Sequence, residues 1–187
     1  MSVRLGILAL LAERPMHGYQ LRHQFEQRTG GTWPVNIGQV YTTVQRLVRD
    51  GLVEPVPDAP ADDVERFRLT ERGRHEVGDW WLRPVERGTP AREELVIKLA
   101  LAVTAEGVDV AQVVQAQRTE TMRALHDYTR LKTGAGPLKA GAADAPDGLD
   151  LAWLLVLDNL IFATEAEVRW LDHVEARVGR SRLKETP

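Results

Sequence analysis

The stretch from residue 36 to residue 49 carries the side chains best suited to chemistry with a partner. On one side of a helical projection it holds short polar groups and arginines: Gly38, Thr42, Gln45, Arg46 and Arg49, with Gln39, Tyr41 and Thr43 beside them. No carboxylate lies on that side before Asp50. Short polar groups near the start of a helix can reach base edges, and arginines further along can bind guanine or phosphate. This combination suits a helix that enters the major groove of DNA.

The opposite side of this stretch is apolar. Its apolar residues recur at i, i+4, i+7 and i+8, which is the spacing of one buried helical stripe: Val40, Val44, Leu47 and Val48. Asn36 can cap the first turn, and Gln39 three residues later can complete a capping box. Gly51 follows as a typical C-terminal stop. The sequence therefore predicts a helix that is buried on one side and exposed on the other.

Two shorter helices are predicted before this one. The first covers residues 3–11 and ends before Pro15, and the second covers residues 19–28. Gly18 lies in the tight connection between them, where a residue free to adopt positive φ is expected. Helix, helix, short loop and helix is the order of a helix-turn-helix unit. Tyr19, at the start of the second helix, joins the candidate DNA contacts.

A two-stranded wing is predicted after the third helix. Residues 52–56 and 66–69 have the composition of short strands. The second strand alternates between an apolar side and an outward side that carries two arginines: Phe67 and Leu69, then Arg66 and Arg68. The loop between the strands is acidic, with Asp58, Asp62, Asp63 and Glu65. Phosphate would repel this tip, so wing contacts with DNA are expected from the two arginines. Thr70 is expected to cap a further helix that ends near Arg83.

Composition narrows the classes of function. The chain of 187 residues has no cysteine, which excludes disulfides and thiolate chemistry and fits a reducing compartment. Its net charge of −3 argues mildly against nucleic acid as a partner. Residues 2–56, however, hold six arginines and four carboxylates, a net charge of +2. The acidic excess therefore lies outside the predicted helix-turn-helix unit.

Motifs for catalysis, cofactors and membranes are missing from the sequence. The histidines are scattered, and there is no nucleophile motif, Walker loop or dinucleotide fingerprint. We expect no metal, no cofactor and no enzymatic activity. The apolar run near the N-terminus is about seven residues long and lacks a small-residue cleavage site. No apolar stretch approaches the roughly 18 residues of a membrane span. These features predict a soluble cytoplasmic protein without membrane contact.

A change in composition near residues 87–90 predicts two domains. Residues 1–87 form the winged helix-turn-helix, with three helices and a two-stranded wing, and residues 88–187 form an α-helical dimerisation domain. The expected fold class is therefore mainly α.

Three helices are predicted in the second domain. Thr89 as cap and Pro90 at the first helical position start one of them. Another covers residues 108–131, and the longest covers residues 149–178. Residues 133–148, rich in glycine, alanine and proline, are expected to form a flexible loop between these two.

The longest predicted helix carries a coiled-coil-like seam, with apolar residues spaced by three and four: Leu154, Leu157, Ile161, Thr164, Val168 and Leu171. Its first half is apolar almost all round, which one neighbouring helix cannot cover. A homodimer through the C-terminal helices is therefore expected. Trp153 and Leu157 are candidate contacts to a small apolar ligand between subunits, with core packing as the alternative role.

The chain resembles the PadR family of transcriptional regulators in a series of motifs: Leu-Gly-Ile-Leu-Ala-Leu-Leu at 5–11, His-Gly-Tyr-Gln-Leu at 17–21, Gly-Gln-Val-Tyr-Thr-Thr-Val-Gln-Arg-Leu at 38–47, Asp-Gly-Leu-Val at 50–53 and Leu-Thr-Glu-Arg-Gly-Arg at 69–74. The resemblance implies a winged helix-turn-helix homodimer that binds a double-stranded DNA operator, usually as a repressor. It also implies that Tyr41 and its neighbours meet DNA. Many members have proline where this chain has Thr42, so the start of the third helix differs here.

Two other classes of function stay open. The acidic wing tip and the negative net charge favour, to some degree, a winged-helix module that binds another protein and not DNA. An enzyme built on the helical half has no recognisable site to support it. For the regulator, a small-molecule effector is a further expectation.

Overall fold

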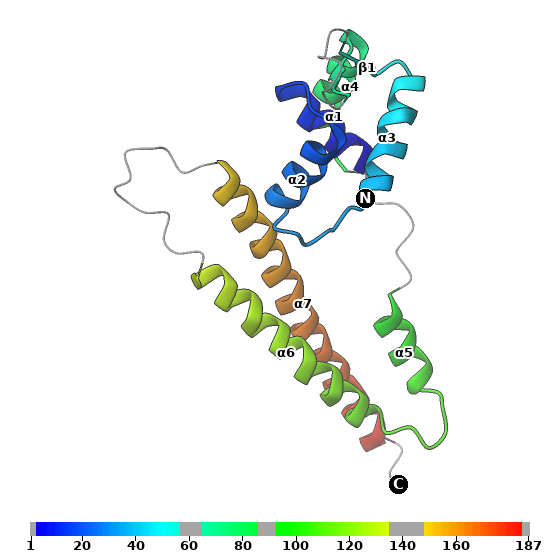
Figure 1. The fold of residues 1–187 in the computed structure, drawn as a ribbon. Helices are drawn as coiled ribbons and strands as arrows, with labels where there is room; N and C mark the ends of the chain where they lie inside the picture. Colours follow the sequence, from blue (N-terminus) through cyan, green and yellow to red (C-terminus); the bar gives the residue numbers. More distant parts are fainter. Residues whose placement is uncertain (1–2, 57–64, 86–92, 135–147, 185–187) are drawn as a thin grey trace. The chain divides into compact units, whose positions relative to one another are not determined.

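Figure 1 shows the computed structural model, in which helices dominate and one small sheet is present. Contacts divide the chain into two compact units, Met1–Glu86 and Arg87–Pro187. The predicted division after residue 87 falls in a segment outside the described residues. The structure describes four ranges: 3–56, 65–85, 93–134 and 148–184.

The first unit contains four helices and a two-stranded sheet: α1 (Val3–Glu13), α2 (Gly18–Arg28), α3 (Ile37–Arg49), β1 (Val53–Pro55), β2 (Phe67–Leu69) and α4 (Glu71–Leu82). Helix α1 packs against α2, α3 and α4. The apolar stripes of these helices meet in one core, whose fully buried members include Ile7, Leu8, Leu21, Val44 and Leu47. The predicted fold class, mainly α with an N-terminal winged helix-turn-helix, is confirmed.

Side-chain caps begin α2, α3 and α4. Asn36 Oδ1 accepts a hydrogen bond from Gln39 N at 2.8 Å, as predicted for α3. The complete capping box lies one helix earlier, at α2. There His17 Nδ1 accepts from Gln20 N at 3.3 Å, and Gln20 Oε1 accepts from His17 N at 3.2 Å. Sequence reading placed the box at α3 because asparagine is a common cap and histidine is not.

The wing is shorter than predicted. Its strands are antiparallel and pair Val53 with Leu69, Glu54 with Arg68 and Pro55 with Phe67. Met16 adds a bridge to Phe67, with two backbone hydrogen bonds of 3.1 and 2.9 Å. This bridge ties the connection between α1 and α2 to the wing. Of the acidic tip, Asp58, Asp62 and Asp63 lie outside the described residues.

Gly73 brings α4 close to the start of the wing. A Cβ at this position would lie 2.1 Å from the carbonyl oxygen of Leu52, so only glycine fits. Thr70 caps α4 through a hydrogen bond of 3.1 Å from Gly73 N, and its hydroxyl also donates to Gly51 O at 2.8 Å. The predicted cap is confirmed, and it joins α4 to the end of α3.

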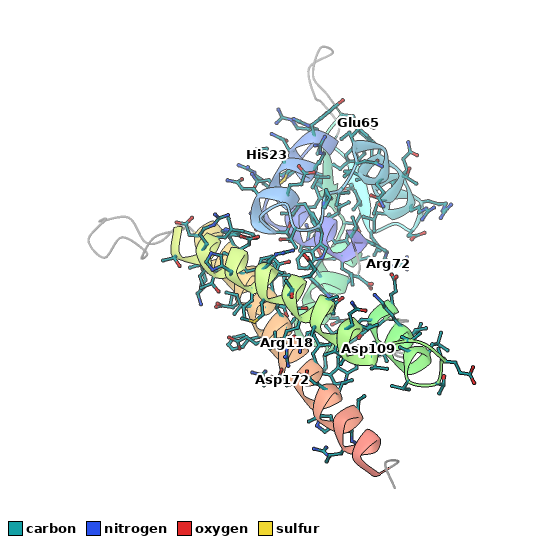
Figure 2. All side chains as sticks on the ribbon, turned by 90° about the horizontal axis from the view of Figure 1, so that it is seen from below. His23, Glu65, Arg72, Asp109, Arg118 and Asp172 are labelled. Atoms are coloured by element: carbon teal, nitrogen blue, oxygen red, sulfur yellow. The ribbon has the colours of Figure 1, made fainter. Side chains whose placement is uncertain are left out.

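The second unit holds three helices: α5 (Glu94–Ala102), α6 (Val110–Gly134) and α7 (Gly148–Lys184). Helices α6 and α7 run side by side (Figure 1). Arg118 of α6 forms ion pairs with Asp172 and Glu175 of α7, and Figure 2 shows Arg118 and Asp172 near each other. From the predicted seam, Leu157 and Leu171 are fully buried.

The helix boundaries of this unit differ by a few residues from the predicted ones: α6 covers 110–134 rather than 108–131, and α7 covers 148–184 rather than 149–178. Helix α5 begins at Glu94 because Glu93 is extended, with φ −82° and ψ 113°. Thr89 and Pro90, where the start was predicted, lie outside the described ranges. Helix α6 continues to Gly134, into the segment predicted as loop.

Candidate nucleic-acid interface

Helix α3 is sharply divided between a buried and an exposed side. Val40, Val44 and Leu47 are at most 1% exposed. The exposed side holds the polar and cationic residues predicted for it: Gly38, Gln39, Thr42, Gln45, Arg46 and Arg49. The apolar stripe anchors the helix in the core, so the polar face is held in one orientation. This confirms the predicted division between the two sides of the helix.

The arginines of α3 differ in their surroundings. Arg46 is exposed and has no ion-pair partner in the described part of the chain. Arg49 is also exposed, and its Nε lies 3.8 Å from Asp50 Oδ1, a loose pair. Because an exposed pair of this kind contributes little free energy, both guanidinium groups can bind an anionic partner.

Tyr41 is more buried than expected for a DNA contact. Its ring packs over Gly18, and a Cβ on Gly18 would lie 2.7 Å from Tyr41 Cζ. The ring also meets Tyr19 edge to face, with centroids 6.4 Å apart and planes at 82°. Tyr41 therefore holds the start of α2 against α3, whereas Tyr19 remains 58% exposed.

The expectation that Gly18 adopts positive φ was wrong. Gly18 is the first residue of α2, and it is absent from the glycines with positive φ. The glycine is needed instead because the ring of Tyr41 occupies the space of a side chain. Sequence reading missed this role, because the two residues are 23 positions apart and no local pattern joins them.

Two polar candidates on α3 already have partners in the helix. Thr43 Oγ1 donates to Gln39 O at 2.7 Å, and the residue is half-buried. Asn36 uses its side-chain oxygen to cap the helix and keeps its amide nitrogen for a partner. Thr42 and Gln45 are exposed, so they are better placed than Thr43 to reach a base edge.

The wing arginines differ as well. Arg68 Nε donates to Glu54 Oε1 at 2.7 Å across the two-stranded sheet. This ion pair offsets the positive charge of Arg68. Arg66 is exposed, as is Glu65 beside it.

The ligand candidates of the second unit lie on α7. Leu157 is fully buried, which is a packing role, and Trp153 is half-buried. A different tryptophan, Trp170, lines a cavity together with Ala163 and Ala166. The sequence analysis did not single out Trp170. A signal was present, because Ala163 and Ala166 lie seven and four positions before Trp170 on the same helical face, and such small residues leave space beside a tryptophan.

Two kinds of feature are absent from the described ranges. These residues contain no group of three histidine, aspartate or glutamate side chains that could hold a metal ion. Within the same ranges no helix combines the length and the apolar character needed to span a membrane.

The fold and the exposed face of α3 together define a class of protein domain. A trihelical core with a two-stranded wing presents a helix whose exposed face carries polar groups and arginines, and this is a winged helix-turn-helix domain. Family models support the same conclusion. Residues 7–79 match the transcriptional regulator PadR-like family, and residues 91–178 match the C-terminal region of virulence activator alpha. Residues 7–79 are therefore a PadR-like domain, and proteins of the PadR-like family are DNA-binding transcriptional regulators, not enzymes.

Individual relatives cover the chain almost end to end. It is 21% identical over 184 residues to the negative transcriptional regulator PadR of Bacillus subtilis (strain 168), covering 95% of this chain and 98% of that protein. The crystal structure of Bacillus subtilis PadR in complex with operator DNA matches with a TM-score of 0.69 at 19% identity, over 95% of this chain and 99% of that one. Its complex with p-coumaric acid matches with a TM-score of 0.70 at 19% identity, over 95% and 98%. At 19% identity, the likeness to these two structures shows that this chain shares their fold.

Proposed function

We propose that this protein is a repressor that binds a palindromic operator in double-stranded DNA as a homodimer. The observation that carries the proposal is the exposed face of α3, where Thr42, Gln45 and Arg46 stand on a helix anchored by a fully buried stripe. The operator complex of the Bacillus subtilis relative supports DNA as the partner. In this proposal residues 1–87 bind DNA and residues 88–187 dimerise.

A direct test measures binding of the full chain to the DNA upstream of its own gene. Fluorescence anisotropy should show tight binding to that duplex and weaker binding to a shuffled duplex of the same composition. Affinity for both should fall as salt rises, because phosphate contacts release counterions. Equal binding to both duplexes would remove the sequence-specific operator from the proposal.

Dimerisation is supported by the exposed apolar side chains of α7. Leu151, Leu155 and Phe162 are 52%, 61% and 66% exposed in the single chain. Large apolar patches of this kind typically mark an interface. A two-fold dimer would place two α3 helices about one turn of DNA, roughly 34 Å, apart. In light scattering, Phe162→Asp should shift the mass from dimer to monomer, whereas Phe162→Leu should not.

Release by a small apolar ligand is the regulatory part of the proposal. The p-coumaric acid complex of the relative shows that a family member binds a small molecule. In this chain Trp153 is half-buried and Leu157 is fully buried, so a ligand would reach Leu157 only after the packing around it changed. Quenching of tryptophan emission that parallels operator release, and is lost in Trp153→Leu, would support this site.

A protein-binding module without DNA is the alternative. The pairing of Arg68 with Glu54 and the exposed Glu65 favour it, because both reduce the positive charge of the wing. The absence of binding to any duplex at low salt would favour this alternative over the operator.

A further inference from the structure

A cavity of about 670 Å³ lies between α5 and α7 in the second unit. Its lining comes from the start of α5 and the middle of α7: Glu93, Glu94, Leu95, Val96, Ala163, Ala166, Glu167 and Trp170. The volume falls within the range of sites that hold small molecules, and the cavity is open to solvent, since five of its eight described lining residues are exposed. Trp153 and Leu157 are not among its described lining residues.

The space exists because α7 has small residues beside a large one. Ala163 and Ala166 precede Trp170 by seven and four positions, so the three lie on one helical face. Trp170 is half-buried, and both it and Leu95 pack against the apolar cluster of Leu99 and Leu171. The core thus holds the indole in place while part of it lines the cavity.

All charged residues among the described lining of the cavity are negatively charged. Three carboxylates, those of Glu93, Glu94 and Glu167, line the cavity, and no lysine or arginine is among its described lining residues. The remaining lining is apolar. Carboxylates without a matching cation create a negative potential, which solvent screens at the exposed Glu93 and Glu94 and screens less at the half-buried Glu167.

Glu167 is held in position by neutral groups of α6. Its Oε1 accepts hydrogen bonds from Thr121 Oγ1 at 2.6 Å and from Gln117 Nε2 at 3.0 Å. In the described part of the chain Glu167 has no ion pair, and Oε2 has no hydrogen-bond partner. These two hydrogen bonds fix the orientation of the Glu167 carboxylate beside the cavity.

We propose that this cavity binds an organic cation, a compact apolar body that carries an ammonium or amidinium group. The face of an indole attracts a cation, and the carboxylate of Glu167 pairs with the same charge. The apolar lining from Leu95, Val96 and the two alanines covers the apolar body of the ligand. An anionic ligand is disfavoured, since it would face three carboxylates.

The test uses two probes of nearly equal shape. Benzyltrimethylammonium carries the charge, and neopentylbenzene replaces its nitrogen by carbon. In calorimetric titrations of the full chain, the cation should bind about tenfold more tightly than the neutral probe. Glu167→Gln keeps a hydrogen-bond acceptor for Thr121 and should reduce affinity for the cation about tenfold while leaving the neutral probe unchanged. Trp170→Leu should weaken the cation more than the neutral probe.

Matched controls lie on the same helix. Glu165→Gln removes a carboxylate that pairs with Arg169 and does not line the cavity, so it should leave binding unchanged. Trp153→Leu removes the other tryptophan of α7 and should do the same. Glu94→Gln provides a second charge variant at an exposed position, in case Glu167→Gln disturbs the contact of α6 with α7.

Three outcomes would overturn the proposal. The first is equal affinity for the two probes, and the second is unchanged cation affinity in both Glu167→Gln and Glu94→Gln. The third is no cation binding together with a changed dimer dissociation constant in Trp170→Leu, which would make the cavity an interface between copies of the chain. Any effect of the cation on operator affinity rests on the proposed function. The titrations contain no DNA, so a failure of operator binding leaves their result intact.

Discussion

In the first unit Leu8, Val44 and Leu47 are fully buried by helices of the same chain, whereas in the second unit Leu155 and Phe162 of α7 remain 61% and 66% exposed. The first unit packs α1 against three other helices, so apolar stripes meet from several directions. The second unit is mainly a pair of long helices, and a pair can bury only one stripe of each. The difference indicates that the first unit completes its core alone, while α7 has apolar surface left for a partner.

The exposed large apolar and aromatic residues of the first unit fall into two groups. Tyr19, which packs against Tyr41 of α3, and Trp33, which precedes α3, form the first group. Trp81, Leu82 and Val85 form the second group, at or just beyond the C-terminal end of α4, away from the polar face of α3 in the sequence. The DNA-facing helix of this proposal is anchored by Val40, Val44 and Leu47, and its own polar face carries no large apolar side chain.

The largest expected effect is on the core of the first unit. Leu47→Ala should lower the free energy of unfolding by about 2–5 kcal/mol, because it removes a fully buried side chain and leaves a cavity. Urea denaturation followed by circular dichroism measures the change. Leu155→Ala is the matched control and, at concentrations where the chain is monomeric, should stay within about 0.5 kcal/mol of wild type. If both variants lost a similar amount of unfolding free energy, Leu155 would be as well packed as Leu47, and the difference in burial between the two units would be contradicted.

Gly18→Ala should be the next largest change. A methyl group there overlaps the ring of Tyr41, and such overpacking costs about 1–3 kcal/mol of stability. Operator affinity should also fall, because the ring must move and α2 and α3 shift apart. Gly78→Ala, at an open helical position in α4, should instead stabilise the protein by about 0.5–1 kcal/mol. If Gly18→Ala and Gly78→Ala changed stability in the same direction, the ring of Tyr41 would not hold α2 against α3.

Arg46→Ala tests the exposed face without touching the core. It should weaken operator binding by about 1–3 kcal/mol if the guanidinium reads a base, with unfolding unchanged. Arg123→Ala, which removes an arginine of α6 paired with Glu120, is the control and should leave operator affinity unaltered. An equal loss on unrelated DNA with a flatter salt dependence would assign Arg46 to the phosphate backbone. No change at all would mean that another face binds DNA.

The smallest expected effect concerns pH. The hydrogen bonds from Arg28, at 2.5 and 2.7 Å, lower the pKa of Glu13 from its ordinary value of 4.5. A lowered pKa in the folded state means that the stabilisation is present above about pH 4.5 and is lost as the pH falls through the lowered value. The pair is partly exposed, so its contribution should be about 0.5 kcal/mol or less. Denaturation of Glu13→Gln at pH 6 and pH 3 should show a smaller acid loss than wild type, and an identical loss would falsify this assignment.

Much of the first unit could be read from the sequence. The stripe of Val40, Val44 and Leu47 and the caps Asn36 and Thr70 are confirmed. Each of these signals acts within about one or two turns of the chain, so neighbouring residues suffice to reveal it. The same holds for the polar face of α3, because a helix buried on one side exposes the other.

Only the tertiary structure decided which side chains meet across elements. It packed Tyr41 over Gly18, paired Arg68 with Glu54, and placed Trp170 rather than Trp153 beside a cavity. These contacts depend on the distance and angle between elements, which follow from the packing of the whole core and not from any short stretch. The sequence by itself determined the amphipathic helices, their caps and the face that α3 exposes, because periodicity and capping are local. The packing of these helices against one another depended on contacts between residues far apart in the chain. The same contacts decided which residues each arginine and tryptophan meets.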